Sequence, residues 1–278
     1  MAFEVGTANN HSDLLEKLKV FATKHGWSAV RHIKHDTGET ELWLHGKGES
    51  GVEKIYLGFK TESSYEDDRF NLALKCSPLF SNGAKFNEMP NSTKEKYFYL
   101  WQHAIPYFFV LNKDFILIIS QISTKSHLVY LGKLRQYCSL GHWPRQMGVF
   151  GESDKPTGRW SDEGDDFSTL QFINPRANEV LWIDNTGISA TRNYPRQGGF
   201  KVLDGKPIDD TNDRWLIQMF CIHDKYGALG EFQRCFYISG RNVATGQRFK
   251  SPDGNREFVV VQNIHRAGFK DYMAVELA

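Results

Sequence analysis

Two histidine residues and a neighbouring carboxylate are the first place in this sequence where metal chemistry could occur. His32 and His35 lie three residues apart, with Asp36 beside the second histidine. Imidazole and carboxylate groups are common metal ligands. Residues three apart on a strand point to opposite faces, however, so joint ligation would require a bend. We therefore predict a solvent-exposed strand end rather than a metal site.

Motifs for nucleophilic or nucleotide chemistry are weak or missing. His223 and Asp224 could form half of an acid–base pair. No serine lies in a G-x-S-x-G context, so a hydrolase triad has no support. No GxxxxGK[ST] motif occurs, and no GxGxxG motif lies between a strand and a helix. Without such a backbone cradle for phosphates, an NTPase or a dinucleotide enzyme is not predicted.

Two acidic clusters could in principle bind calcium. Glu66, Asp67 and Asp68 lie together, and four acidic residues lie within 162–166. Calcium requires several oxygen ligands, but neither cluster has EF-hand spacing. Paired carboxylates for glycoside hydrolysis stay open, although nothing singles out a pair. We interpret both clusters as solvated loop charge. The sequence thus predicts no catalytic residue, no cofactor and no metal ligand.

Aromatic residues gather in one short stretch. They occupy residues 97–99, position 101 and residues 107–109. A strand with aromatic side chains on both faces must be covered on both faces. The cover is either the chain's own core, which we favour, or a neighbouring subunit.

A single helix is predicted over residues 12–25. Ser12 and Asp13 can cap its start, and Glu16 follows Asp13 by three residues. Apolar residues then recur at helical spacing. Gly26 can supply a left-handed stop.

After this helix the apolar period changes to two, which is typical of strands. Ile55, Leu57 and Phe59 share one face, so we expect a sheet with one packed and one solvated face. The strands predicted in this part are 27–34, 40–47, 53–60 and 70–76.

The clearest hairpin lies within residues 106–123. Asn112 and Lys113 suggest a two-residue turn of a primed type. Residues 115–119 show no polar alternation, which predicts a central strand covered on both faces. Residues 128–135 are the next predicted strand.

The chain changes character after position 150. Residues 151–166 and 192–214 are polar and rich in glycine or proline, so we expect long loops there. Residues 252–254 should close a hairpin. Strands are predicted at 170–173, 180–183, 215–222, 232–239, 258–264 and 272–277.

The expected fold class is mainly β, with sandwich or barrel-like antiparallel sheets and one N-terminal α-helix. Residues 1–150 would form a helix plus an antiparallel β domain. Residues 151–278 would form a second β-rich domain or a β extension with long loops.

Composition excludes several classes of protein. The 278 residues carry a net charge of +1, which gives no electrostatic footprint for nucleic acid or anionic membranes. Four cysteines without a CxxC pair predict free buried thiols. The N-terminus has no signal-peptide pattern, so we expect synthesis in the cytoplasm. The apolar stretch 104–122 contains Pro106 and polar residues, which argues against a membrane helix.

One block of the sequence resembles tailed-bacteriophage virion proteins. WQHAIPYFFVL (101–111) followed by DFILIISQISTKSHLVYLGKL (114–134) is similar to an aromatic strand, a polar turn, a strand ending in Ser-Thr and a Tyr-Leu-Gly strand in that group. Residues 3–27, 54–61 and 259–278 resemble the same group. The loop after Gly132 departs from it, because YCSLGHWP replaces a Tyr-Pro run.

The resemblance implies a non-enzymatic virion component of the neck, collar or tail. It would assemble as a multi-copy, symmetric homo-oligomer and contact other phage neck or tail proteins, without membrane or specific nucleic-acid binding. It would be made in the host cytoplasm and found in the virion. An alternative is a tail- or baseplate-associated carbohydrate-binding or glycan-degrading β module, in which Trp143, Trp160 and Trp215 stack on sugars. A second alternative is an assembly factor absent from the finished particle.

Overall fold

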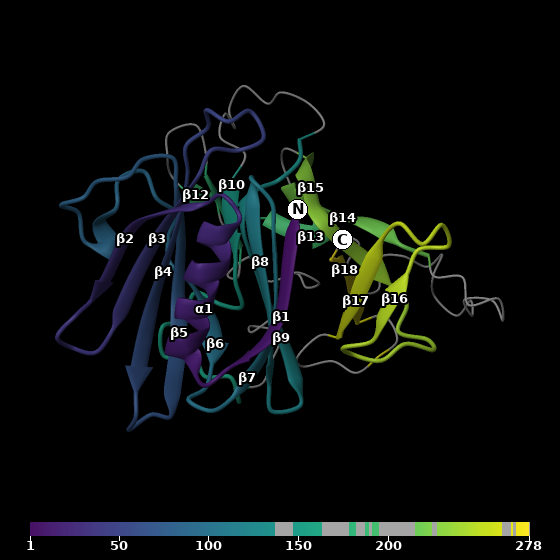
Figure 1. The fold of residues 1–278 in the computed structure, drawn as a ribbon, viewed down its shortest axis with the longest axis horizontal. Helices are drawn as coiled ribbons and strands as arrows, with labels where there is room; N and C mark the ends of the chain where they lie inside the picture. Colours follow the sequence, from purple (N-terminus) through teal and green to yellow (C-terminus); the bar gives the residue numbers. More distant parts are fainter. Residues whose placement is uncertain are drawn as a thin grey trace.

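The fold is known from a computed structural model, in which three antiparallel sheets and one α-helix are described (Figure 1). This confirms the predicted mainly β class with an N-terminal helix. The described residues are 1–136, 147–162, 178–181, 187–188, 191–194, 215–223, 227–262, 268 and 271–277. All statements about the structure below concern these residues.

The strands form sheets of seven, five and six members. In spatial order, the seven-stranded sheet contains β1 (Ala2–Ala8), β7 (Ile105–Leu111), β8 (Phe115–Ile122), β9 (Lys125–Lys133), β10 (Met147–Phe150), β11 (Asn178–Leu181) and β12 (Gly187–Ile188). The five-stranded sheet contains β2 (Ser28–Lys34), β3 (Thr40–Gly46), β4 (Ile55–Ser64), β5 (Arg69–Ser77) and β6 (Lys96–Leu100). The six-stranded sheet contains β13 (Thr191–Tyr194), β14 (Ile217–His223), β15 (Gly227–Ile238), β18 (Tyr272–Glu276), β17 (Glu257–Gln262) and β16 (Arg248–Lys250).

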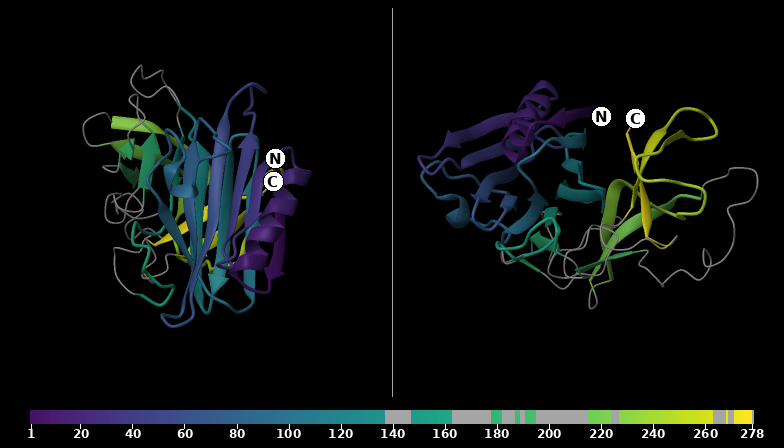
Figure 2. Two further views of the ribbon diagram at one scale, coloured as in Figure 1. Left: turned by 90° about the vertical axis from the view of Figure 1, so that its left-hand side faces the viewer. Right: turned by 90° about the horizontal axis from the view of Figure 1, so that it is seen from below.

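The seven-stranded sheet is the middle layer of the molecule (Figures 1 and 2). One apolar core lies between it and the five-stranded sheet and includes Phe59, Phe98 and Ile118. A second core lies between it and the six-stranded sheet and includes Leu117 and Phe232. Burial of two continuous cores supplies the main driving force for this stack.

Strand β8 confirms the prediction of a strand covered on both faces. Ile116, Ile118 and Ile122 face the first core, whereas Phe115 and Leu117 face the second. A strand buried on both faces has no need for polar alternation.

The turn between β7 and β8 differs from the primed type that we predicted. None of its residues has a positive φ. The Oδ1 atom of Asn112 instead accepts hydrogen bonds from the backbone N–H groups of Asp114 (2.8 Å) and Phe115 (3.0 Å). An Asn side chain that mimics a backbone turn in this way removes the requirement for glycine.

Helix α1 (His11–Lys24) confirms the predicted helix, but its cap lies earlier. The side chain of Asn10 accepts from the N–H of Asp13 at 2.9 Å, and Asp13 accepts from the N–H of Asn9. Gly26 supplies the predicted left-handed stop with φ of +94°. The apolar side of α1 joins the core between the five- and seven-stranded sheets.

Most of the outer face of the five-stranded sheet is covered, which corrects the expected solvated face. Residues 80–89, including the 3₁₀ turn η1 (Phe86–Glu88), pack on Trp43. Residues 155–158 bind to the start of β5, because Arg69 and Asn71 donate to the carbonyls of Pro156 and Gly158. The alternation of apolar and polar residues within a strand does not indicate whether a distant loop covers one face of the sheet.

Several expectations for the second half can also be compared with the structure. The strand expected at 170–173 lies outside the described residues. The loop expected at 192–214 begins as strand β13, and its later part lies outside the described residues. The turn at 252–254 does close a hairpin, between β16 and β17. Strand β10 pairs with β11, so strand pairing crosses residue 150. The division into two domains stays a prediction.

Cys76, Cys221 and Cys235 are buried thiols outside any disulfide, as predicted, whereas Cys138 lies outside the described residues. In the described part of the chain, no helix is long and apolar enough to cross a membrane.

Candidate functional site

The structure separates His32 from His35. The Nε2 atom of His32 lies 2.7 Å from Oε1 of Glu16 on helix α1, whereas Nε2 of His35 lies 3.5 Å from Oε2 of Glu41. The two imidazoles therefore lie on opposite faces of the five-stranded sheet, as strand geometry predicts. Within the described ranges, no three His, Cys, Asp or Glu side chains gather as a metal site would require. The side chain of His223 and all of Asp224 lie outside those ranges.

The acidic cluster at 66–68 forms the β4–β5 turn. Asp67 and Ser64 bond to each other there, and Asp68 has a positive φ of 49°. Of the second cluster, Asp162 is described and pairs with Arg159 at 3.5 Å. The rest of that cluster lies outside the described residues, so their joint chemistry stays untested.

The aromatic residues that drew attention in the sequence are mostly part of the core. Phe98 faces the core between two sheets, whereas Tyr97 and Tyr99 face the covered outer surface. Their cover comes from this chain, as we favoured. Trp160 contacts Trp101 in an edge-to-face pair, with ring centroids 5.5 Å apart. Trp215 is 61% exposed, and Trp143 lies outside the described residues.

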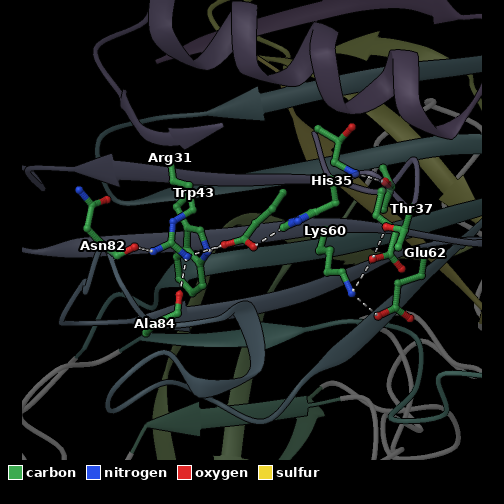
Figure 3. A network of polar contacts seen from close by, with 12 residues as sticks. Arg31, His35, Thr37, Trp43, Lys60, Glu62, Asn82 and Ala84 are labelled. Carbon is green, nitrogen blue, oxygen red and sulfur yellow. Dashed lines mark hydrogen bonds and ion pairs between the residues drawn. The ribbon is translucent and has the colours of Figure 1, made fainter. Parts of the chain in front are cut away.

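A polar network lies on the covered outer face of the five-stranded sheet (Figure 3). The buried Arg31 guanidinium donates to Oε1 of Glu41 at 2.7 Å. It also donates to three backbone carbonyls, at Ser81, Asn82 and Ala84, over 2.7–2.8 Å. Because five donors in a planar fork suit this arrangement, one side chain holds the 81–84 loop to β2.

The same network fixes Trp43. Its Nε1 donates to Oε1 of Glu41 at 2.8 Å. Its ring lies over Gly58, where an added Cβ would meet the ring at 2.7 Å. Our sequence analysis missed this network. Arg31, Glu41 and Trp43 alternate along predicted strands, which is a signal for one shared face, but the loop carbonyls that bind Arg31 have no sequence signature.

A second group of charges lies further along this face. The Nζ atom of Lys60 lies 3.2 Å from Glu39 and 3.6 Å from Glu62. Burial would lower the pKa of Lys60, but these carboxylates outweigh it and the pKa is raised. Burial raises the pKa of Glu62 despite the opposing effect of Lys60. Burial therefore favours the protonated form of the Glu62 carboxyl.

A polar pocket of about 480 Å³ opens at the β6 side of this face. Lys75, Asn87, Lys94, Glu95, Lys96, Tyr97 and Asp154 line it. The hydroxyl of Tyr97 donates to Oε2 of Glu95 at 3.0 Å, and the Nζ atom of Lys75 lies 3.9 Å from Oε1 of Glu95. Burial and the nearby carboxylates of Glu62 and Glu95 raise the pKa of Tyr97, so this phenol stays protonated.

A buried His–Glu pair links two sheets. The Nδ1 atom of His127 on β9 lies 2.7 Å from Oε1 of Glu152, whose Oε2 accepts from the N–H of Tyr99 on β6 at 2.7 Å. Ser120 is the cross-strand neighbour of His127, but neither its Oγ nor Nε2 of His127 has a hydrogen-bond partner. These residue types could form a nucleophilic triad, yet all three are fully buried and cannot meet a substrate. Their arrangement is structural.

The edge strands of the sheets differ in how well they are protected. Strand β2 carries Arg31, His32 and Lys34 and has an irregular register, and β16 has only three residues, two of them basic. Strand β1 is seven residues long and carries a single charge, on Glu4, which accepts from the hydroxyl of Tyr107 at 2.8 Å. Charges, bulges and short length block edge-to-edge pairing, so β1 is the least protected of these edges.

No protein-family model matches the chain, and no curated protein matches it.

Proposed function

We propose that this chain is a non-enzymatic structural subunit of a tailed-phage particle. In this proposal it assembles as a multi-copy ring or collar at the neck or tail and contacts other virion proteins there. It would be made in the host cytoplasm and end in the virion. The proposal starts from the resemblance of residues 101–134, which contribute β7, β8 and β9, the middle of the central sheet.

The observation that carries the proposal is the open edge of β1. Val5 on this strand is 48% exposed, and the strand pairs with β7 along one side. Backbone groups along the other side can pair with a strand from a neighbouring copy. Contacts of this kind close a ring when the rotation between copies closes.

The test is the mass of the protein in solution, measured by light scattering during gel filtration over a range of concentrations. We expect a closed oligomer for the natural chain. Val5→Lys should reduce it to monomers, because an edge lysine opposes strand pairing. Val20→Lys is the matched control, since Val20 is 62% exposed on helix α1 and belongs to no strand. It should leave the mass unchanged.

A protein that stays monomeric at high concentration, and is absent from purified particles by proteomics, would contradict the proposal. An oligomer in solution that is absent from particles would instead favour an assembly factor.

The glycan-active alternative is favoured by one observation, the carboxyl groups near Tyr97. Glu62 and Glu95 both act on the Tyr97 phenol, so they lie at one place on the sheet. Glycoside hydrolysis requires one protonated and one ionised carboxyl flanking the sugar. Release of reducing sugar from host glycans by the natural chain, and its loss in Glu62→Gln, would support this alternative over a purely structural role.

A further inference from the structure

The loop that Arg31 binds carries the single Asn-Gly pair of the sequence, Asn82–Gly83. The backbone nitrogen that follows an asparagine can attack the side-chain carbonyl carbon and close a cyclic imide. Glycine in the second position favours this attack, because no Cβ crowds the nitrogen and the backbone there is permissive. The pair is therefore a place where the chain can modify itself without an enzyme.

Both reacting groups of this pair are accessible. Asn82 and Gly83 are exposed in a turn, and Figure 3 shows the Asn82 side-chain amide pointing away from the Arg31 network. Among the described residues, neither this amide nor the N–H of Gly83 has a hydrogen-bond partner. A Cβ added at Gly83 would meet nothing within 4 Å. Solvent can therefore reach the nitrogen, and no neighbour holds it in place.

The Asp253–Gly254 pair could react in the same way, but its groups are held. The N–H of Gly254 donates to the carbonyl of Ser251 at 2.8 Å. The carboxylate of Asp253 accepts from the backbone N–H and the side-chain amide of Asn255, at 3.2 and 3.0 Å, and from the hydroxyl of Ser251. Closing an imide at this turn would break these bonds, so the two pairs should differ in reactivity.

Arg31 also activates the peptide group that joins Asn82 to Gly83. Its Nη2 donates to the carbonyl oxygen of Asn82 at 2.7 Å. The Gly83 nitrogen belongs to the same peptide group and must lose its proton before it attacks. The resulting negative charge is shared with the carbonyl oxygen, and a hydrogen bond from a cation to that oxygen favours the charged form.

We propose that Asn82 is a site of spontaneous deamidation. Solvent takes the proton of the Gly83 amide, the nitrogen forms a bond to Cγ of Asn82, and the Cγ–Nδ2 bond breaks. The leaving nitrogen takes a proton from solvent and departs as ammonia. Water then opens the imide at either carbonyl and gives aspartate or isoaspartate at position 82.

The isoaspartate form changes how the 81–84 loop binds Arg31. In this form the former Asn82 carbonyl carbon belongs to a carboxylate, which competes with Glu41 for the guanidinium. The backbone also gains one atom between the carbonyls of Ser81 and Ala84, both of which accept from Arg31. We expect loss of the bond to Ala84 and faster hydrogen exchange of amides around 81–84.

The experiment incubates the full chain for several weeks in mildly alkaline buffer, with peptide mapping by mass spectrometry at intervals. We expect the mass change of an amide replaced by an acid at Asn82. A peptide of residues 79–86 in the same buffer gives the rate without Arg31, and the folded chain should react at least as fast. A methyltransferase specific for isoaspartate should label position 82 and leave Asp253 unlabelled.

Gly83→Ala is the test variant. The space at Gly83 is open and its φ lies outside the left-handed region, so an added Cβ should not disturb folding. The Cβ hinders the attack, and deamidation should slow severalfold. Lys85→Ala is the matched control, since Lys85 is highly exposed in the same covering segment and its side chain is in neither reacting group. Its rate should equal that of the natural chain.

Any of four results would overturn the proposal. They are an intact Asn82 after incubation, a rate in the folded chain severalfold below that of the peptide, equal labelling of positions 82 and 253, and equal rates in Gly83→Ala and the natural chain. Unchanged hydrogen exchange around 81–84 in the isoaspartate form would contradict the effect on Arg31.

Discussion

The two faces of the five-stranded sheet are stabilised by different means. The inner face is apolar and packs on the central sheet, with Leu57, Phe59 and Leu74 fully buried. The outer face is also largely buried, but beside an apolar cluster around Trp43 it is held to its covering loop by hydrogen bonds, such as those from Arg31 to the carbonyls of Ser81 and Asn82. The burial of a face therefore does not show whether apolar packing or polar contacts stabilise it. An apolar face tolerates changes that conserve volume, whereas a polar face depends on complete pairs of partners.

The largest loss of stability is expected from removing a large apolar side chain from the inner face. Phe59→Ala should lower the free energy of unfolding by about 3–5 kcal/mol, because it removes buried area and leaves a cavity. Urea denaturation followed by tryptophan fluorescence measures this. Phe59→Leu is the control and should cost much less. A loss below about 1 kcal/mol for Phe59→Ala would mean that this face is loosely packed.

Removing the cation of the polar network on the outer face should lower the free energy of unfolding by about 3 kcal/mol. Arg31→Met leaves Glu41 buried without its cation, and the cost of such an unpaired charge exceeds that of removing both partners. The double variant Arg31→Met with Glu41→Gln should therefore recover part of the stability. Hydrogen exchange of amides around 81–84 should rise in both. A single variant as stable as the natural chain would show that the network contributes little.

The free energy of unfolding should also depend on pH, because of the buried His11 on the inner side of the five-stranded sheet. Burial lowers the pKa of His11 from 6.5 to about 4 in the folded chain. A depressed pKa gives stability that is complete above pH 6.5 and is lost as the pH falls towards 4. This loss amounts to about 2–3 kcal/mol.

His11→Phe keeps the ring contact with Phe70, whose centroid lies 5.3 Å from that of His11, but has no proton to bind. Urea denaturation between pH 7 and 4 should show a steeper loss for the natural chain than for this variant. Equal slopes would be inconsistent with a buried neutral His11.

The smallest effect is expected at the solvent side of the outer face. Lys60→Gln should change stability by less than about 1 kcal/mol, because partly exposed ion pairs contribute little. It should also raise the pKa of Glu62 further, since Lys60 lowers it. Carbon-13 NMR titration of the carboxyl groups measures this shift. An unchanged titration of Glu62 would mean that Lys60 does not act on it.

The inner side of the fold could be predicted closely. Alternation at Ile55, Leu57 and Phe59 gave the buried face of β4, and the apolar run at 115–119 gave the doubly covered strand β8. The prediction was wrong about the solvated outer face, because the covering segments 80–89 and 155–158 have no periodicity. The pocket was missed for the same reason, since its lining comes from four separate parts of the chain.

Strand β1 was not predicted either. Its sequence AFEVGTA is short and contains Gly6, but the absence of a side chain there makes room for the Tyr107 ring on β7. The need for that glycine exists only once β1 and β7 are paired.

The amino-acid sequence by itself determined the local elements and the apolar faces, because backbone periodicity and capping act between residues close in the chain. The tertiary structure decided which polar residues meet. Arg31 reaches carbonyls about fifty residues away, and Lys75, Glu95 and Asp154 share one pocket. Such contacts depend on distance in space, and no pattern of spacing along the chain encodes them.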